Sequence, residues 1–152
     1  MRVLQSFAMA IVITIVAAPL TAQSTGAGFS LDVAGGMMRY GPHAMVGVEL
    51  SSARLPLAAR VDALVGIAPD HDYPGRTLTA LMIGAVLPFN ANGRVSPYLL
   101  GGATLSQSRY LEPAVGGAAG AGARFRIGAF TPFVEGRMQH RSGPTMSLGL
   151  HI

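Results

Sequence analysis

His140 and Ser142 stand two residues apart, a spacing at which a histidine can serve as the base for a serine nucleophile. A serine hydroxyl is activated only when a base lies within hydrogen-bond reach and a third group orients that base. The only carboxylate close by in the same predicted strand is Glu135, and it falls on the opposite face from His140. A turn with a polar cap is therefore the favoured interpretation of residues 140–142.

The remaining candidates for cofactor or metal chemistry are weaker. Residues 70–72 (Asp-His-Asp) offer ligands for a weakly held cation, but they lie in a loop rich in Pro and Gly, where such side chains are usually solvated. His43, His71 and His151 share no spacing typical of a metal site, and the chain has no cysteine. The glycine-rich residues 116–122 precede neither a helix pattern nor a lysine, so they do not form a nucleotide loop. We expect no catalytic residue, cofactor or metal.

A larger set of charged residues alternates with small and apolar ones. Arg124 and Arg126 are two residues apart, as are Glu135 and Arg137, and residues two apart share one face of a strand. The same alternation elsewhere completes a set of four acids and four bases, which are Asp32, Glu49, Arg60, Asp62, Arg124, Arg126, Glu135 and Arg137. A closed barrel of eight strands is only just wide enough inside for side chains, and unpaired buried charges are costly. We therefore expect these residues to pair with one another inside a barrel.

Eight segments with this period-two alternation are available to position the charges. They span residues 28–40, 43–51, 57–68, 77–89, 95–108, 114–127, 131–140 and 145–152, with connections at 109–113 and 141–144 among others. A tilted transmembrane strand needs roughly 9–11 residues, and an even number of strands lets an antiparallel meander close. The predicted fold class is all-β, an eight-stranded antiparallel up-and-down transmembrane β-barrel.

The start of the chain has the features of a secretory signal. Arg2 precedes an uncharged apolar run at 7–20, and Ala22 offers a cleavage point. We predict a cleaved signal peptide at 1–22 and a single barrel domain at 23–152. No later stretch reaches the roughly 18 apolar residues of a membrane helix. The net charge of +4 is modest and no basic run tracks a phosphate backbone, so nucleic acid is not an expected partner.

Aromatic residues are expected to mark both membrane interfaces of such a barrel. If the N-terminus enters from the periplasm, the predicted periplasmic rim holds Phe29, Phe89, Tyr98, Phe125, Phe130 and Phe133. The predicted outer rim holds Tyr40, Tyr73 and Tyr110.

Four motifs make the second half of the chain resemble small bacterial outer-membrane β-barrel proteins, the eight-stranded OmpA- and OmpX-like family. They are RVSPYLLGG at 94–102, AGARFR at 121–126, FVEGR at 133–137 and SLGLHI at 147–152. The resemblance covers roughly 87–152 by motif and the first half by pattern. It implies residence in the cell outer membrane, contact with its lipid, and recognition of the last strand by the barrel-assembly machinery. The family usually ends in an aromatic residue, whereas this chain ends in Ile152.

The sequence favours a structural or interaction role for an outer-membrane barrel that is not a general porin. Two alternatives stay open. One is a lipid A-modifying enzyme, because some barrels that deacylate lipid A carry a His and a Ser two residues apart, as His140 and Ser142 are here. The other is a soluble periplasmic or secreted barrel that binds a lipophilic ligand.

Overall fold

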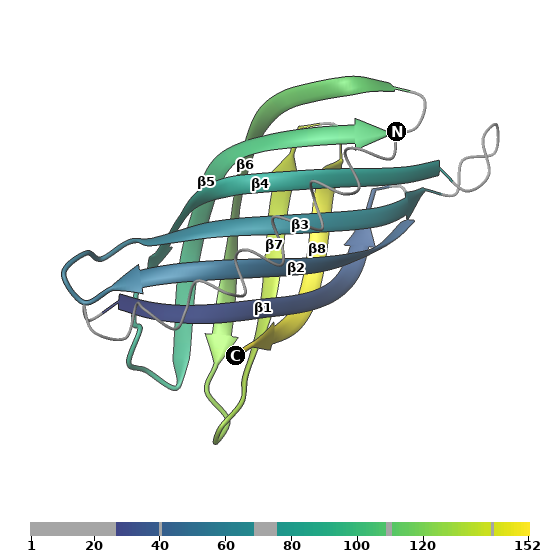
Figure 1. The fold of residues 1–152 in the computed structure, drawn as a ribbon. Helices are drawn as coiled ribbons and strands as arrows, with labels where there is room; N and C mark the ends of the chain where they lie inside the picture. The colour runs from purple at the N-terminus through teal and green to yellow at the C-terminus, as the bar shows by residue number, and fades with distance from the viewer. Residues whose placement is uncertain (1–26, 40, 69–75, 109–110, 141) are drawn as a thin grey trace.

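The structure, a computed structural model, describes residues 27–39, 41–68, 76–108, 111–140 and 142–152. In this part of the chain eight antiparallel strands follow one another around a closed barrel, and the first strand pairs with the last (Figure 1). The predicted eight-stranded antiparallel barrel is therefore confirmed. Within the same residues, no helix is both long and apolar enough to cross a membrane. The predicted signal peptide at 1–22 lies outside the described residues.

The strand boundaries follow the period-two pattern of the sequence. The strands are β1 (Ala27–Met38), β2 (Gly41–Ser52), β3 (Ala58–Ala68), β4 (Arg76–Pro88), β5 (Val95–Ser108), β6 (Leu111–Phe125), β7 (Thr131–Gln139) and β8 (Gly143–His151). The predicted segments agree with these limits to within two residues, apart from the start of β6.

Strand β6 begins at Leu111, so the predicted connection at 109–113 is wrong at its C-terminal limit. Pro113 suggested a loop because proline cannot donate a hydrogen bond within a sheet. The structure accommodates it because β6 pairs with β7 only from Ala118 onward, opposite Gln139. Pro113 therefore lies where β6 has a neighbour on one side only, and a missing N–H is tolerated at such an edge.

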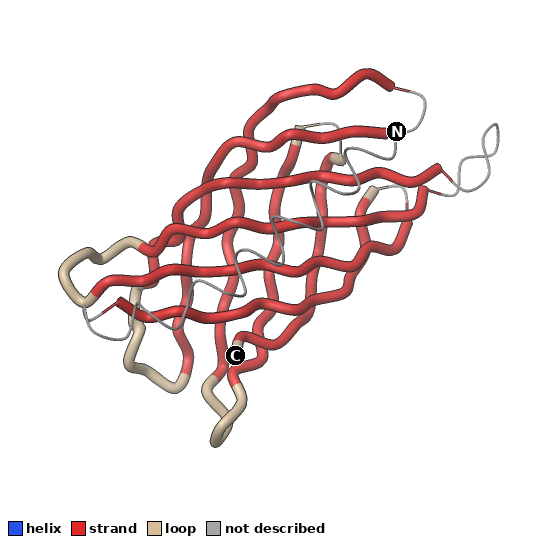
Figure 2. The backbone as a smooth tube through the Cα atoms, viewed as in Figure 1, coloured by secondary structure: helices blue, strands red, loops and turns tan. Residues whose placement is uncertain are grey.

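The seam between β1 and β8 closes the barrel. The paired residues run from Asp32 opposite His151 to Met38 opposite Thr145. Beyond them, Leu31 and Ile152 exchange two backbone hydrogen bonds, at 2.8 and 2.9 Å. The connections after β2, β4 and β6 lie at the same end of the barrel as Ile152, and we call this the turn end (Figure 2).

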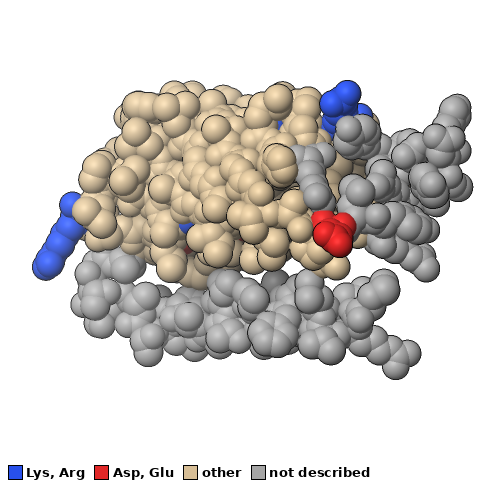
Figure 3. Space-filling model, turned by 90° about the horizontal axis from the view of Figure 1, so that it is seen from above, with Lys and Arg blue, Asp and Glu red and all other residues tan. Residues whose placement is uncertain are grey.

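Side chains alternate between the interior and the exterior along each strand. In β2, for example, Met45 and Glu49 are buried while Val46 and Leu50 are exposed. Among the described side chains, the exposed Arg and Glu residues lie in turns or near strand ends, and they are Arg39, Arg54, Arg94, Glu112 and Arg126. Between its two ends, the face of the barrel seen in Figure 3 carries almost no Lys, Arg, Asp or Glu. Between the two ends, the outward side chains are therefore mainly apolar, and the charged ones face inward.

Two aromatic residues predicted at the periplasmic rim lie inside the barrel instead. Tyr98 and Phe133 are each only 1 % exposed. In each strand these residues alternate in phase with the buried side chains. They therefore face the interior, although they lie at the level where an outward aromatic girdle was expected. Phe89 and Phe130 are exposed at the turn end, as predicted. The predicted outer-rim residues Tyr40, Tyr73 and Tyr110 lie outside the described residues.

Candidate functional site

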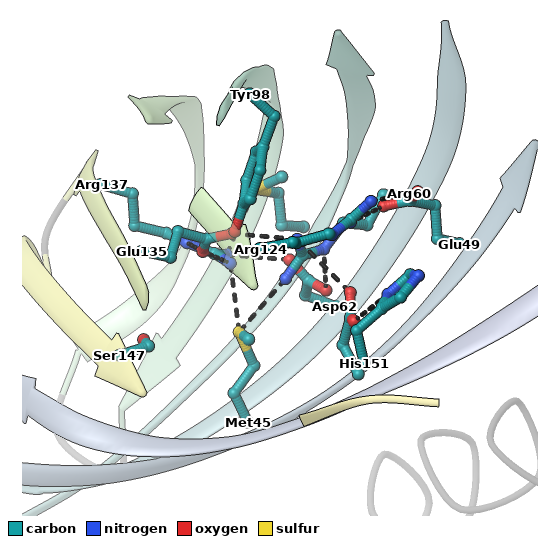
Figure 4. A network of polar contacts seen from close by, with 12 residues as sticks. Met45, Glu49, Arg60, Asp62, Tyr98, Arg124, Glu135, Arg137, Ser147 and His151 are labelled. Carbon is teal, nitrogen blue, oxygen red and sulfur yellow. Dashed lines mark hydrogen bonds and ion pairs between the residues drawn. The ribbon is translucent and has the colours of Figure 1, made fainter. Parts of the chain in front are cut away.

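Four charged side chains form a closed cycle at the centre of the barrel, which we call the charge ring: Arg60, Asp62, Glu135 and Arg137. Arg60 donates to Asp62 through Nε at 2.8 Å and to Glu135 through Nη1 at 2.9 Å. Arg137 donates to Asp62 through Nη1 at 2.9 Å and to Glu135 through Nε at 2.6 Å. Figure 4 shows these side chains converging from different strands. Each acid therefore lies between two bases, and each base between two acids.

The charge ring is built from two strands on opposite walls of the barrel. Arg60 and Asp62 stand on β3, whereas Glu135 and Arg137 stand on β7. The two pairs have the same spacing and the opposite order of charge. When β3 and β7 face each other across the interior, each cation therefore meets an anion at its own level.

Asp32 extends the ring toward the turn end. Its Oδ2 lies 3.4 Å from Nη1 of Arg60, and its Oδ1 lies 2.7 Å from Nδ1 of His151. Asp32 is fully buried, while the His151 side chain is 19 % exposed. His151 therefore connects the deepest charges of the barrel with its mouth.

A second ion pair crosses the interior between β2 and β6. Arg124 donates to both carboxylate oxygens of Glu49, with Nη1 at 3.0 Å from Oε1. Planar two-point pairing of this kind is the strong geometry for an arginine and a carboxylate. Tyr98 links this pair to the charge ring, because the Arg124 guanidinium lies 4.8 Å from its ring centre and its hydroxyl donates to Glu135 at 2.8 Å.

Sulfur and aromatic groups fill the space around the charges. Met45 Sδ lies 3.1 Å from Nη2 of Arg137, and Met82 Sδ lies 3.5 Å from its Nη1. The guanidinium of Arg60 stands over the ring of Phe133 at 5.9 Å. Met45, Met82 and Phe133 are each at most 2 % exposed. The interior at this level is thus packed with side chains.

Glycines on the interior face make room for these large groups. A Cβ added at Gly47 would lie 2.1 Å from Oδ1 of Asp62, and one added at Gly122 would lie 2.4 Å from the Tyr98 hydroxyl oxygen. Real atoms do not approach so closely. Glycine at positions 47 and 122 is therefore a packing requirement of the charge network.

The structure brings seven of the eight sequence-predicted site residues together: Asp32, Glu49, Arg60, Asp62, Arg124, Glu135 and Arg137. Arg126 is the exception and corrects the prediction. It follows the last residue of β6, is exposed, and donates to the backbone carbonyls of Ala91 and Asn92 at 3.1 and 3.4 Å. The period-two rule was extended beyond Phe125, where the strand ends.

His151 is the functional residue that the sequence prediction left out. Without Arg126, the seven residues hold three bases and four acids. The His151 ring lies beside Asp32, with Nδ1 2.7 Å from Oδ1, and gives this carboxylate a second partner besides Arg60. The signal was present in the sequence, since His151 shares the parity of Thr145 and Ser147, which are buried in β8. We call these seven residues together with His151 the interior charge network.

The other end of the barrel interior combines buried polar groups with an apolar cluster around Met38 and Leu64 and has little formal charge. His43 Nε2 lies 2.9 Å from the Ser147 hydroxyl, and both residues are buried. Ser106, Ser108 and Thr145 are buried at neighbouring levels. No group of three His, Asp or Glu side chains suited to a metal ion is found in the described residues. The stretch predicted as a weak cation site, 70–72, lies outside them.

Ser142 does not share the outward face of His140, although the two residues are two apart in the chain. It is fully buried and donates to the Gln139 side-chain oxygen at 3.1 Å, whereas His140 is exposed. Parity holds only within a strand, and the chain turns here before Gly143, whose φ is +68°. Glu135, the carboxylate nearest in sequence, already accepts from two arginines and Tyr98.

Known proteins give a likeness of fold. No family model and no curated protein matches the sequence. The crystal structure of Neisserial surface protein A (NspA) is 13% identical with a TM-score of 0.64, covering 83% of this chain and 96% of that one. A structure titled "De novo design of transmembrane beta-barrels" is 18% identical with a TM-score of 0.59, covering 83% and 93%. The solution structure of the de novo designed TMB2.3 is 21% identical with a TM-score of 0.59, covering 83% and 94%.

These similarities extend over most of each chain, although the sequences have diverged. At such low identity they show the fold alone. The chain thus has the fold of eight-stranded transmembrane β-barrels.

Proposed function

We propose that this chain is an integral outer-membrane β-barrel protein with a structural or interaction role, and that its interior charge network closes the barrel to ions. The observation that carries the proposal is that polar and apolar side chains are distributed in the opposite way from a soluble protein. Charges are buried inside in mutual contact, and large apolar residues cover the outside between the two ends.

The outer surface favours lipid over water. Twenty-two large apolar side chains of the described chain are exposed, among them Met37, Ile67, Ile83, Met138 and Leu148. A soluble monomer rarely exposes contiguous apolar patches beyond a few hundred Å². In lipid, every backbone polar group must be paired within the protein, and a closed sheet achieves this. The shortest strands, β7 and β8, have nine residues each, which is enough for a tilted crossing of the hydrocarbon layer.

The interior favours a plug over a pore. An aqueous channel needs an open path lined by polar groups, whereas here charged, thioether and aromatic side chains meet across the lumen. Arg60, Glu135 and Phe133 are each at most 1 % exposed. This argues equally against a lipophilic ligand lying in the interior, which would need an apolar cavity at this level.

Cell fractionation tests the location. We expect the mature protein in the outer-membrane fraction, soluble only in detergent, and migrating faster on a gel before heating than after it. Recovery from the periplasm in aqueous buffer would overturn the proposal.

Single-channel recording tests whether the interior charge network closes the barrel, since a stable large conductance from the purified barrel would contradict it.

The absence of catalysis is also part of the proposal. Lipid A from cells that express the protein is expected to match that of cells with the empty vector. A loss of acyl chains that depends on both His140 and Ser142 would favour the lipid A-modifying alternative.

We also propose that β8 is the strand read by the barrel-assembly machinery. Met146, Leu148 and Leu150 alternate on its outer face, and Ile152 closes the seam with Leu31. The proposal therefore makes Ile152 a residue for assembly as well as for stability.

A further inference from the structure

A cavity of about 720 Å³ opens at the turn end of the barrel. It is bounded by the connections after β2 and β4 and by the ends of β1, β6, β7 and β8. The pair of Arg124 and Glu49 lies at its inner side, next to His151. The interior charge network therefore separates this cavity from the polar side chains at the opposite end.

The charges that line the cavity do not balance. Glu49 is its only acidic residue among those described, and both of its oxygens accept from Arg124. Arg126 also lines the cavity, and it donates to the backbone carbonyls of Ala91 and Asn92, which are neutral and leave its positive charge in place. Guanidinium groups therefore outnumber carboxylates two to one among the side chains that line the cavity.

Arg124 carries a donor that the described residues leave without an acceptor. The residue is only 9 % exposed, and its Nε–H is buried without a hydrogen-bond partner among the described residues. A buried charged donor without a partner is costly, so native structures normally satisfy it. This Nε–H has no exposed surface, so an anionic oxygen in the cavity becomes its acceptor once the guanidinium turns toward the cavity.

The rest of the lining combines hydroxyl groups with apolar surface. Ser30, Ser96 and Thr131 offer hydroxyls that can donate to an anionic oxygen. Leu55 and Leu57 line the cavity in the connection after β2 and are 64 % and 47 % exposed. An occupant with a charged group and an alkyl chain would satisfy both surfaces together.

We propose that this cavity binds an amphiphile with an anionic headgroup, a carboxylate or a phosphate. The headgroup lies between Arg124 and Arg126, and the alkyl chain leaves past Leu55 and Leu57. This binding activity goes beyond a structural role, and the cavity exists whichever membrane holds the barrel.

Amide chemical shifts of the folded protein in neutral dodecyl maltoside micelles test the proposal. The probes are dodecyl phosphate, dodecanoate, dodecyltrimethylammonium and inorganic phosphate. We expect saturable shifts at Ser96 and Thr131 with dodecyl phosphate, with dodecanoate or with both, and the two arms identify which headgroup the site takes. No saturable shift with either anion overturns the proposal, as does an equal response to the cationic amphiphile. If inorganic phosphate produces the same saturable shifts with the same affinity as dodecyl phosphate, the alkyl chain contributes nothing and the assignment to an amphiphile is overturned.

Arginine variants locate the site. Arg126→Gln is expected to weaken binding about tenfold, because one charged hydrogen bond is lost. Arg126→Lys, which keeps the charge but not the planar contact with the turn, is expected to retain most of the affinity. Arg94→Gln removes the same charge from an exposed arginine at this end that does not line the cavity, and should leave binding unchanged. Equal weakening by Arg94→Gln and Arg126→Gln overturns the assignment. Thr131→Val, which removes one lining hydroxyl, gives an independent reading if Arg126→Gln does not fold.

Discussion

Arg60 and Glu135 meet across the interior with 2.9 Å between Nη1 and Oε2, although they stand on opposite walls and 75 residues apart in the chain. Asp62 and Arg137 repeat the contact one level away with the same separation in sequence. A barrel of this width allows such contacts only when both partners are long enough to reach the centre together. The two strands thus recognise each other through side chains, although no backbone hydrogen bond joins them.

Removing one member of the charge ring should cost more than an ordinary substitution. Glu135→Ala leaves Arg60, Arg137 and Tyr98 without their shared acceptor, and we expect a loss of about 3–5 kcal/mol in the free energy of unfolding. Reversible denaturant unfolding in detergent micelles or lipid vesicles measures it. Glu112→Ala removes an exposed carboxylate near the start of β6 and should cost at most about 1 kcal/mol, the range for exposed ion pairs. Equal effects of the two substitutions would contradict the interior location.

The pair of Glu49 and Arg124 should show energetic coupling. Each single change, Glu49→Gln or Arg124→Gln, leaves a buried charge without its partner, whereas the double change leaves two neutral amides that can still bond. We expect the double variant to be more stable than the less stable single variant, with a coupling energy of about 0.5–3 kcal/mol. Additive effects in this thermodynamic cycle would show that the ion pair contributes no coupling.

Gly122 and Gly117 provide a matched pair of substitutions in β6. Gly122→Ala places a methyl group against Tyr98, moves its hydroxyl away from Glu135, and should cost about 1–3 kcal/mol. Gly117 is exposed, and an added Cβ there meets no atom closer than 3.9 Å, so Gly117→Ala should be tolerated. Tyrosine fluorescence and unfolding curves report both effects. A neutral Gly122→Ala would show that Tyr98 has space to move.

Two histidines separate an interior role from a surface one. His151→Ala removes a partner of buried Asp32 and should destabilise the barrel by about 1–3 kcal/mol. His140→Ala changes an exposed residue in the turn before β8 and should have a much smaller effect. Thermal unfolding of both variants at the same pH provides the comparison. If His140→Ala proves the more damaging, His151 does not belong to the interior charge network.

The last residue should influence assembly. Ile152→Asp places a charge at the seam where Ile152 bonds to Leu31, and we expect less heat-modifiable protein in the membrane. Ile152→Phe keeps a large apolar side chain at the seam and should assemble at least as well. Ile127→Asp changes an exposed isoleucine in a turn at the same end and serves as the control. Equal loss with Ile127→Asp would assign the effect to surface charge instead of the seam.

The strands and their inward faces were predictable because period-two alternation is strong wherever one face meets lipid and the other a packed interior. The segment at 77–89 alternates less clearly in sequence, since interior residues of β4 such as Met82 and Val86 are apolar too. Its length and its flanking turns were still sufficient to place the strand.

The partners of the charged residues could not be deduced in the same way. Alternation gives the face of a residue but not its level along the barrel axis, so Arg126 was counted inside while His151 was left out. Counting acids and bases concealed the error, because the four acids and four bases balanced only with Arg126 included. The spacing shared by Arg60-Asp62 and Glu135-Arg137, with their charges in opposite order, is the sequence signal that does identify a cross-barrel contact.

The separation of 75 residues between partners also has a kinetic meaning. A sheet that has formed only some of its strands cannot make any of these three contacts, because β2 and β3 reach β6 and β7 only across a closing barrel. Contacts so distant in the chain form slowly and late. Breaking them requires the barrel to open with its charges unpaired. We therefore expect folding to end in a single cooperative step and unfolding to be slow. The lifetime of the folded protein then depends on its slow unfolding rate as much as on its equilibrium free energy of unfolding.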